Sequence, residues 1–243
     1  MELLVFKTEK ELDCYVGKYI VDFINQHDEP HLGFATGLTP LGIYQYLIDE
    51  YRKGNVDFSS VKAFNLDEYV GLEKSHPRSF AYAMKENLFQ HINIKPENIY
   101  ALNGKAKDME EECLRYEQEI KNNPIDIQIL GIGMDGHIAY NEPGSPFDGG
   151  CHVVDLHQES IESSLDYGFD DIKDVPKQGV TQGIATIMQS KQLIMIAKGL
   201  KKAPLVQRML EGEVTVDFPS SIIQKHPHVI VALDEEAASY LKK

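Results

Sequence analysis

Three side chains that can move protons lie within eight positions in the middle of the chain: Asp135, His137 and Glu142. A histidine between two carboxylates has a tunable pKa and can accept or donate a proton near neutral pH. This spacing therefore favours general acid–base chemistry. The alternative is a glycine-rich turn whose carboxylates only cap the following segment.

The residues around this triad place it on a loop at the end of a strand. Residues 125–130 form an apolar run bounded by glycine, which is typical of a buried strand. Gly131, Gly133 and Gly136 then allow close backbone approach and sharp turns. Because open α/β sheets bind ligands at the carboxyl ends of their strands, we expect this loop to border a binding crevice.

A fourth candidate, Asp67, follows another predicted strand at residues 61–66. Adjacent side chains of extended backbone point to opposite faces, so Asp67 and Glu68 are not expected to share one role. Asp67 can face the same crevice as His137 and have a functional role there. Acidic residues are common at strand ends, so an ordinary exposed carboxylate is the alternative.

Two further segments can hold an anion. The first comes directly before a predicted helix and consists of Thr36, Gly37, Leu38 and Thr39. Thr39 is the expected N-cap and Pro40 the first helical residue, and free N–H groups at such a helix start attract anions. An ordinary capped helix shows the same pattern. Lys202, in a turn before another helix, either neutralises phosphate or is a surface lysine.

Predicted strands and helices alternate along the chain. Strands are expected at residues 3–6, 31–35, 61–66, 98–102, 125–130, 153–156, 193–197 and 229–233. Helices are expected at residues 8–25, from 40, at 79–90, 108–121, 180–188 and 202–210, and after Asp234. This alternation is typical of an α/β fold with a mostly parallel sheet and helices on both faces, a Rossmann-like three-layer sandwich. We expect one domain over residues 1–243, with residues 157–176 as a lid or surface insertion.

Composition excludes several classes of protein. A net charge of −14 argues against a nucleic-acid partner. Three widely spaced cysteines predict no disulfide framework, and no cluster has metal-ligand spacing, so neither metal nor other cofactor is expected. We see no signal peptide and no apolar run of the ~18 residues that a membrane span needs, which favours a cytoplasmic protein.

Residues 131–145, GIGMDGHIAYNEPGS, closely resemble the signature of the glucosamine-6-phosphate deaminase family, G-x-G-x-D-G-H-I-A/G-F-N-E-P. Tyr140 stands where phenylalanine is usual. Three more motifs are similar to the family's: N-L/M-D-E-Y-x-G-L at residues 65–72, T-G-x-T-P at residues 36–40 and G-x-x-K-A at residues 199–203. The resemblance covers nearly the whole chain.

This resemblance implies an enzyme that converts glucosamine 6-phosphate to fructose 6-phosphate and ammonia. Asp67 would move a proton between two sugar carbons, and His137, tuned by Asp135 and Glu142, would open the sugar ring. Lys202 and the segment Thr36, Gly37, Leu38 and Thr39 would bind the phosphate, although Leu38 replaces the family's usual serine or glycine. Family members occur as monomers and as hexamers, so a homo-oligomer is compatible with the resemblance.

Three other functions fit part of the pattern. The nearest is the same reaction on galactosamine 6-phosphate. A 6-phosphogluconolactonase needs no base at C2, and the Asp67 motif argues against it. A sugar-phosphate sensor of a transcription regulator would carry a basic DNA-binding segment, which this sequence lacks.

The sequence departs from the family at an arginine that contacts the phosphate. Counted back from the matching Val-Pro-Lys at residues 175–177, Tyr167 stands at that position, and residues 116–207 contain no arginine. A bidentate arginine is not freely replaced. We therefore expect weaker phosphate affinity, substitution by Lys173 or Lys177, or a different preferred sugar.

The family's allosterically regulated members are distinguished by a longer C-terminal tail and by arginines near the positions of Gly150 and His152. Neither feature is present in this sequence. We therefore expect no activation by N-acetylglucosamine 6-phosphate.

Overall fold

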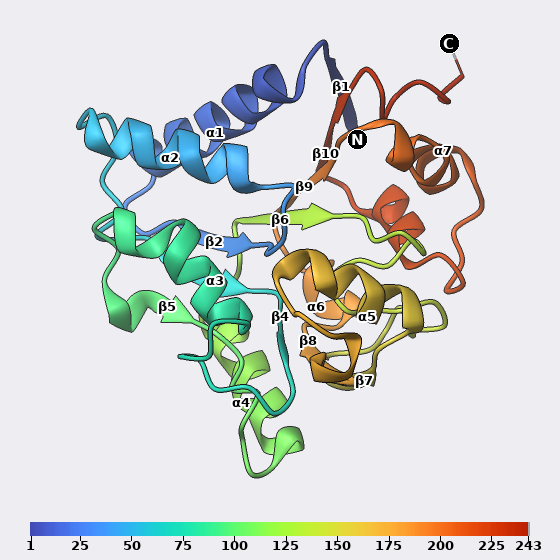
Figure 1. The fold of residues 1–243 in the computed structure, drawn as a ribbon. Helices are drawn as coiled ribbons and strands as arrows, with labels where there is room; N and C mark the ends of the chain where they lie inside the picture. Colours follow the sequence, from blue (N-terminus) through green and yellow to red (C-terminus); the bar gives the residue numbers. More distant parts are fainter. Residues whose placement is uncertain (243) are drawn as a thin grey trace.

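The computed structural model describes residues 1–242, apart from the side chains of residues 166 and 167. Its main feature is a seven-stranded sheet in which all neighbouring strands are parallel (Figure 1). In sheet order the strands are β1 (Glu2–Phe6), β10 (Val229–Asp234), β9 (Gln192–Ala197), β6 (Ile127–Gly131), β2 (His31–Phe34), β3 (Lys62–Asn65) and β5 (Ile99–Tyr100).

Helices cover both sides of this sheet, as expected for a three-layer α/β fold. In Figure 1, α1 and α2 lie together above the sheet, while α4, α5 and α6 lie below it. The α-helices of the described chain are α1 (Glu9–Gln26), α2 (Leu41–Arg52), α3 (Phe80–Asn87), α4 (Met109–Asn122), α5 (Gln158–Ser163), α6 (Ile184–Ile187) and α7 (Ala203–Glu211). The short 3₁₀ helices are Phe89–His91, Pro96–Asn98, Ser164–Tyr167, Ile172–Asp174, Leu200–Lys202 and Pro219–Lys225.

A second, antiparallel sheet of three short strands was not predicted. Its order is β4 (Asp67–Tyr69), β8 (Gln178–Thr181) and β7 (His152–Asp155). Only Leu66 separates β3 from β4, so the chain passes directly from the large sheet into the small one. The small sheet therefore fixes the backbone on which Asp67 lies.

Local sequence explains the first helix and the central strands. Thr8 caps α1 by accepting the N–H of Glu11, and Glu11 reaches back to the N–H of Lys7, a variant of the capping box. Strands β6, β9 and β10 are near-continuous apolar runs because helices bury both of their faces. None of the described helices is long and apolar enough to cross a membrane.

Two of the predicted helices were wrong. Residues 180–188 do not form one helix: β8 ends at Thr181, and α6 is a single turn. Tertiary pairing decides this, because Val180 and Thr181 are buried in the antiparallel sheet. The chain after Asp234 forms turns instead of a helix. Asp234 still accepts the N–H of Ala237, at 2.7 Å, and also that of Gly199.

Candidate active site

Four neighbouring strands of the large sheet end at one edge, and the segments that follow them surround a cavity. In sheet order these strands are β9, β6, β2 and β3. The chain runs from β2 to β3 on one side and from β6 to β9 on the other. Such a reversal opens a crevice at the carboxyl ends of the strands, where ligands of open α/β sheets bind.

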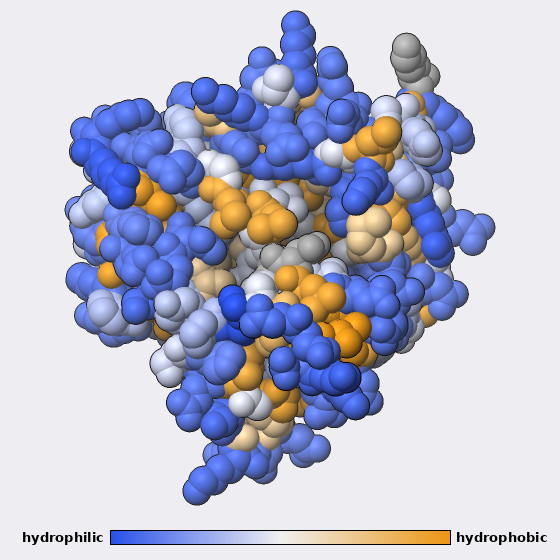
Figure 2. Space-filling model, viewed as in Figure 1, coloured by the Kyte–Doolittle hydropathy of each residue, from blue (hydrophilic) through white to orange (hydrophobic). Residues whose placement is uncertain are grey.

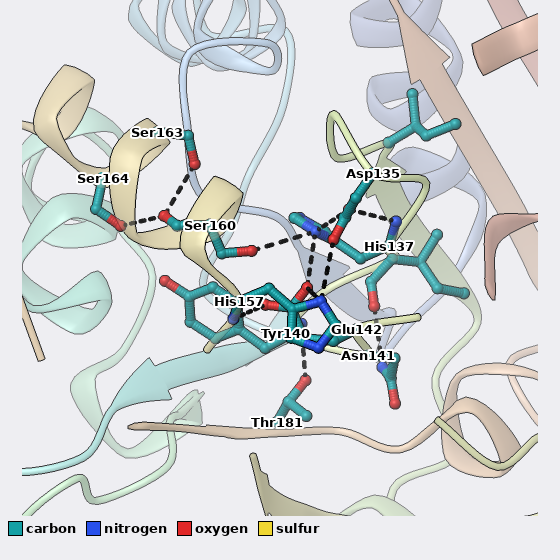
Figure 3. A network of polar contacts seen from close by, with 12 residues as sticks. Asp135, His137, Tyr140, Asn141, Glu142, His157, Ser160, Ser163, Ser164 and Thr181 are labelled. Atoms are coloured by element: carbon teal, nitrogen blue, oxygen red, sulfur yellow. Dashed lines mark hydrogen bonds and ion pairs between the residues drawn. The ribbon is translucent and has the colours of Figure 1, made fainter. Parts of the chain in front are cut away.

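The cavity collects most of the residues that the sequence singled out. Its lining includes Asp67, His137, Lys202, Thr36, Gly37, Leu38 and Thr39, and helix α5 with the turn after it adds Ser160, Ser163 and Ser164. Asp135 and Glu142 do not line it, but lie behind His137 (Figure 3). The described lining residues include no arginine.

Apolar side chains gather on the face of the molecule shown in Figure 2. Leu38 and Met134 line the cavity and are 60% and 47% exposed. The family's usual serine or glycine at position 38 would make the cavity lining polar or leave it open, whereas Leu38 makes it apolar.

His137 is held from behind by two carboxylates (Figure 3). Its Nδ1 lies 2.7 Å from Asp135 Oδ1 and 3.5 Å from Glu142 Oε2. The side chains of Asp135 and Glu142 are 12% and 3% exposed. Because Nδ1 is occupied in this way, Nε2 is the ring nitrogen that can exchange a proton with a substrate.

The loop backbone brings these groups together at the cost of strain. A Cβ at Gly133 would lie 2.2 Å from Cε1 of His137, so only glycine fits against the imidazole. Ala139 has a φ of 51°, a conformation uncommon for residues with a side chain. Strain of this kind clusters at functional sites.

The carboxylates make His137 a stronger base than an ordinary histidine. Burial alone would lower the pKa of His137, but its hydrogen bonds to Asp135 and Glu142 outweigh burial and raise that pKa to about 9. Burial would likewise raise the pKa of Asp135, yet the hydrogen bond from His137 holds it below its usual value. The imidazole is therefore positively charged at neutral pH and can donate a proton.

Asp67 is a buried carboxyl group with little to stabilise its charge. Its residue is 7% exposed, in contrast to the ordinary exposed carboxylate considered above. Burial, reinforced by the nearby charge of Glu68 and opposed by His137, raises the pKa of Asp67 to about 7. A base with this pKa is matched to proton abstraction near neutral pH.

Glu68 has a separate, structural role, as the alternation of side chains predicted. Its carboxylate accepts the N–H groups of Tyr69, Phe80 and Ala81 at 2.8, 3.0 and 3.0 Å. Two of these donors belong to the first turn of α3, where a negative charge is favourable. Glu68 therefore anchors α3 to β4.

The loop after β2, residues 36–39, also lines the cavity. Gly37 has a φ of 101°, which turns the loop after β2. Among the described residues, none accepts a hydrogen bond from the N–H groups of residues 37–39. The predicted N-cap was wrong, because Pro40 caps α2 and makes no side-chain bond. The carbonyl of Thr39 instead accepts from Lys198 Nζ at 2.8 Å.

Two lysines contact segments that line the cavity. Lys202 lines it, and its Nζ donates to the carbonyl of Ile132 at 2.7 Å. Burial lowers the pKa of Lys202, against the opposing effect of Asp135. Lys198, whose side chain is 9% exposed, lies behind the loop and pairs with Asp13 at 2.6 Å. This second lysine was not predicted, because its role depends on Asp13, far away in the sequence.

Sequence reasoning also missed His157. Its Nδ1 lies 3.9 Å from Asp135 Oδ2 and 3.8 Å from Glu142 Oε2. Ligand spacing in the sequence predicted no metal cluster, but the fold brings ligand atoms of Asp135, His137 and Glu142 within 4.8 Å of one another. The side chain of Tyr167, at the position of the missing arginine, lies outside the described residues.

Comparison with known proteins agrees with this geometry. Residues 7–231 match the family of glucosamine-6-phosphate isomerases and 6-phosphogluconolactonases. The chain belongs to this family. It is 43% identical to a glucosamine-6-phosphate deaminase of Clostridium perfringens (strain 13 / Type A) over 100% of both chains. It is 44% identical to glucosamine-6-phosphate deaminase 2 of Bacillus subtilis (strain 168), over 100% of this chain and 98% of the relative.

Among solved structures, this chain is more similar to a glucosamine-6-phosphate deaminase than to a 6-phosphogluconolactonase. A monomeric glucosamine-6-phosphate deaminase superimposes with a TM-score of 0.96 at 40% identity, over 99% of this chain and 100% of the other. The 6-phosphogluconolactonase of Trypanosoma brucei reaches 0.76 at 21% identity, over 99% and 98%. The second comparison shows the shared fold alone.

Proposed function

We propose that this protein is a glucosamine-6-phosphate deaminase, which converts glucosamine 6-phosphate and water to fructose 6-phosphate and ammonia. The observation that carries the proposal is that Asp67 and His137 line one cavity with Lys202 and the loop at residues 36–39. The same cavity thus holds acid–base groups and groups that can bind an anion. An amino sugar with a phosphate on its far carbon has the matching arrangement.

The first step is opening of the sugar ring, which we assign to His137. The protonated imidazole donates a proton to the ring oxygen and accepts one from the C1 hydroxyl, so that C1 becomes an aldehyde. Asp135 and Glu142 do not touch the substrate in this scheme. They position the ring and raise the pKa of His137 to about 9, which keeps the proton available at neutral pH.

Asp67 then acts as the base at C2. It removes the C2 proton while the C1 oxygen gains a proton, which gives an enolamine; it then returns its proton to C1 while the amino nitrogen loses one, which leaves an imine at C2. Water adds to the imine, and loss of ammonia gives the ketone of fructose 6-phosphate. A pKa of about 7 means that Asp67 can both take and return a proton without a large energetic barrier.

The phosphate is proposed to bind at the loop formed by Thr36, Gly37, Leu38 and Thr39. Its backbone N–H groups at the start of α2 and the ammonium of Lys202 supply the positive potential. Leu38 offers only its N–H to the ligand. Because the described lining has no arginine, we expect weaker binding of the phosphate than in a site with a bidentate arginine.

Ammonia release tests the proposal. The whole chain is assayed with glucosamine 6-phosphate, galactosamine 6-phosphate and 6-phosphogluconolactone, and the variant Asp67→Asn is measured beside it. We expect ammonia chiefly from the glucosamine compound, and a loss of about 10²–10⁴ in turnover for the variant with retained substrate binding. Near-normal turnover of Asp67→Asn, or lactone hydrolysis as the main activity, would overturn the assignment.

We also propose that residues 1–243 act as one catalytic domain, because the cavity takes residues from position 35 through position 202. Activation by N-acetylglucosamine 6-phosphate is not expected. A hyperbolic rate curve that this compound leaves unchanged would support that prediction, and a sigmoidal curve that it makes hyperbolic would contradict it.

A further inference from the structure

Two buried carboxylate oxygens behind His137, Asp135 Oδ2 and Glu142 Oε2, make no hydrogen bond of good geometry among the described residues, and Glu142 Oε2 has only the 3.5 Å ion-pair contact with His137 Nδ1. The side chain of Glu142 is 3% exposed, so water does not reach this oxygen freely. A buried acceptor without a partner costs about 1–3 kcal/mol, and more when it is charged. Two such oxygens side by side therefore point to a cationic ligand.

His157 faces both oxygens with one ring nitrogen (Figure 3). Its Nδ1 lies 3.9 Å from Asp135 Oδ2 and 3.8 Å from Glu142 Oε2, which is too far for hydrogen bonds. The backbone N–H of His157 donates to Glu142 Oε1 at 3.2 Å and holds the residue in place. The imidazole nitrogen of His157 thus lies within 4 Å of both carboxylate oxygens.

These separations are close to those of ligands around a tetrahedral metal ion. Zinc binds imidazole nitrogen and carboxylate oxygen at about 2.0–2.2 Å, which places neighbouring ligands about 3.4 Å apart. The observed 3.8 and 3.9 Å differ from this by a few tenths of an ångström, which a side-chain rotation can supply. The side chain of His157 is 44% exposed, so an ion can enter from solvent.

We propose that Asp135 Oδ2, Glu142 Oε2 and His157 Nδ1 form a binding site for a divalent transition cation of the zinc type. Two carboxylates supply negative charge, and an imidazole suits zinc, copper or nickel better than magnesium or calcium, which prefer all-oxygen sites. Solvent fills the remaining coordination position. The site adjoins the catalytic group without including it.

Such an ion would inhibit the enzyme instead of assisting it. Asp135 Oδ1 can keep its 2.7 Å contact with His137 while Oδ2 binds the cation. Glu142 Oε2, which lies 3.5 Å from His137 Nδ1, would be drawn to the ion and would no longer help to hold the His137 ring in position for ring opening. This consequence rests on the proposed deaminase function, whereas binding of the ion does not.

Zinc titration of the metal-free whole chain tests the site. Competition with a chromogenic chelator gives affinity and stoichiometry in the absence of substrate. We expect one zinc ion per chain, and a loss of affinity in His157→Asn at least as large as the 10–100-fold that removal of an outer-shell partner costs. His152→Asn, a histidine in β7 away from this cluster, is the matched control and should bind zinc like the unaltered chain.

Three results would overturn the inference. The first is an unaltered chain that binds zinc no more tightly than His157→Asn. The second is an equal loss of affinity in His152→Asn. The third is anomalous scattering from a zinc-soaked crystal that places the ion on other residues. Zinc binding with unchanged turnover would refute the inhibitory role alone, and zinc binding by a protein without deaminase activity would refute the proposed function alone.

Discussion

Replacement of Asp67 by asparagine is predicted to remove activity and to increase stability. In the folded chain, burial raises the pKa of this carboxyl group from 3.8 to about 7. Each pKa unit corresponds to 1.36 kcal/mol, so the folded protein pays about 4 kcal/mol for holding Asp67 ionised above pH 7. Asparagine has a similar shape and no charge, and it avoids this cost.

The sign of the pH dependence follows from the same shift. The folded-state pKa lies above the unfolded value, so the folded protein binds the proton more tightly. Its stability contribution is complete below about pH 4 and is lost as the pH rises to about 7. Asp67→Asn should therefore match the unaltered chain near pH 4 and exceed it above pH 7.

Thermal unfolding at pH 5, 6, 7 and 8 measures the effect. For a chain of this size about 1 kcal/mol shifts Tm by about 2–4 °C, so we expect a gain of about 10 °C at pH 8 and a smaller gain at pH 5. Asp126→Asn is the control, since Asp126 is paired with Lys191 at 2.7 Å and should show no gain. A variant that is less stable at pH 8, or whose gain is the same at pH 5 and 8, would refute the reasoning.

Three further outcomes are expected. The pH profile of kcat/KM should rise through about pH 7 as Asp67 loses its proton and fall through about pH 9 as His137 does. Lys198→Met should raise KM about tenfold, or about 1.4 kcal/mol, with little change in kcat, because the Thr39 carbonyl loses its donor at the anion loop. Gly133→Ala should lower kcat at least about 100-fold, because the added methyl would displace the His137 ring, and should affect Tm less.

Each of these outcomes has its own contrary result. A kcat/KM optimum below pH 6 would contradict a pKa of about 7 for the base Asp67 and of about 9 for the acid His137. The control is Lys201→Met, three positions along the chain from Lys198. Equal KM values for Lys198→Met and Lys201→Met would contradict the positioning role of Lys198. Unchanged turnover in Gly133→Ala would show that the loop can accommodate the methyl group, and Gly131→Ala, where a Cβ meets nothing within 4 Å, is its control.

The sequence predicted those parts of the fold and site that depend on local pattern. The loop with Asp135, His137 and Glu142 follows a buried strand within a few residues, so its position at a strand end could be read directly. Asp67 was placed in the same crevice by a general rule, because parallel strands present their carboxyl ends at one edge.

Features that depend on distant pairing could not be read in this way. Strand β4 has three residues and exists because β8, more than 100 residues later, pairs with it. The carbonyl of Thr39 is held by Lys198, and α2 has Pro40 as its N-cap in place of Thr39. His157 follows Glu142 by 15 residues, and only the folded chain brings its ring to the carboxylates.

The position of β1 has a consequence for how the protein is made. This strand pairs only with β10 among the described strands, so it bonds to a segment that lies more than 200 residues later in the chain. A growing chain that still lacks Val229–Asp234 leaves Leu3 and Val5, 47% and 48% exposed even in the finished protein, without a neighbour. Sheet completion at this edge must therefore wait until β10 has been synthesised, and until then the β1 segment is a surface for chaperones or for unwanted association.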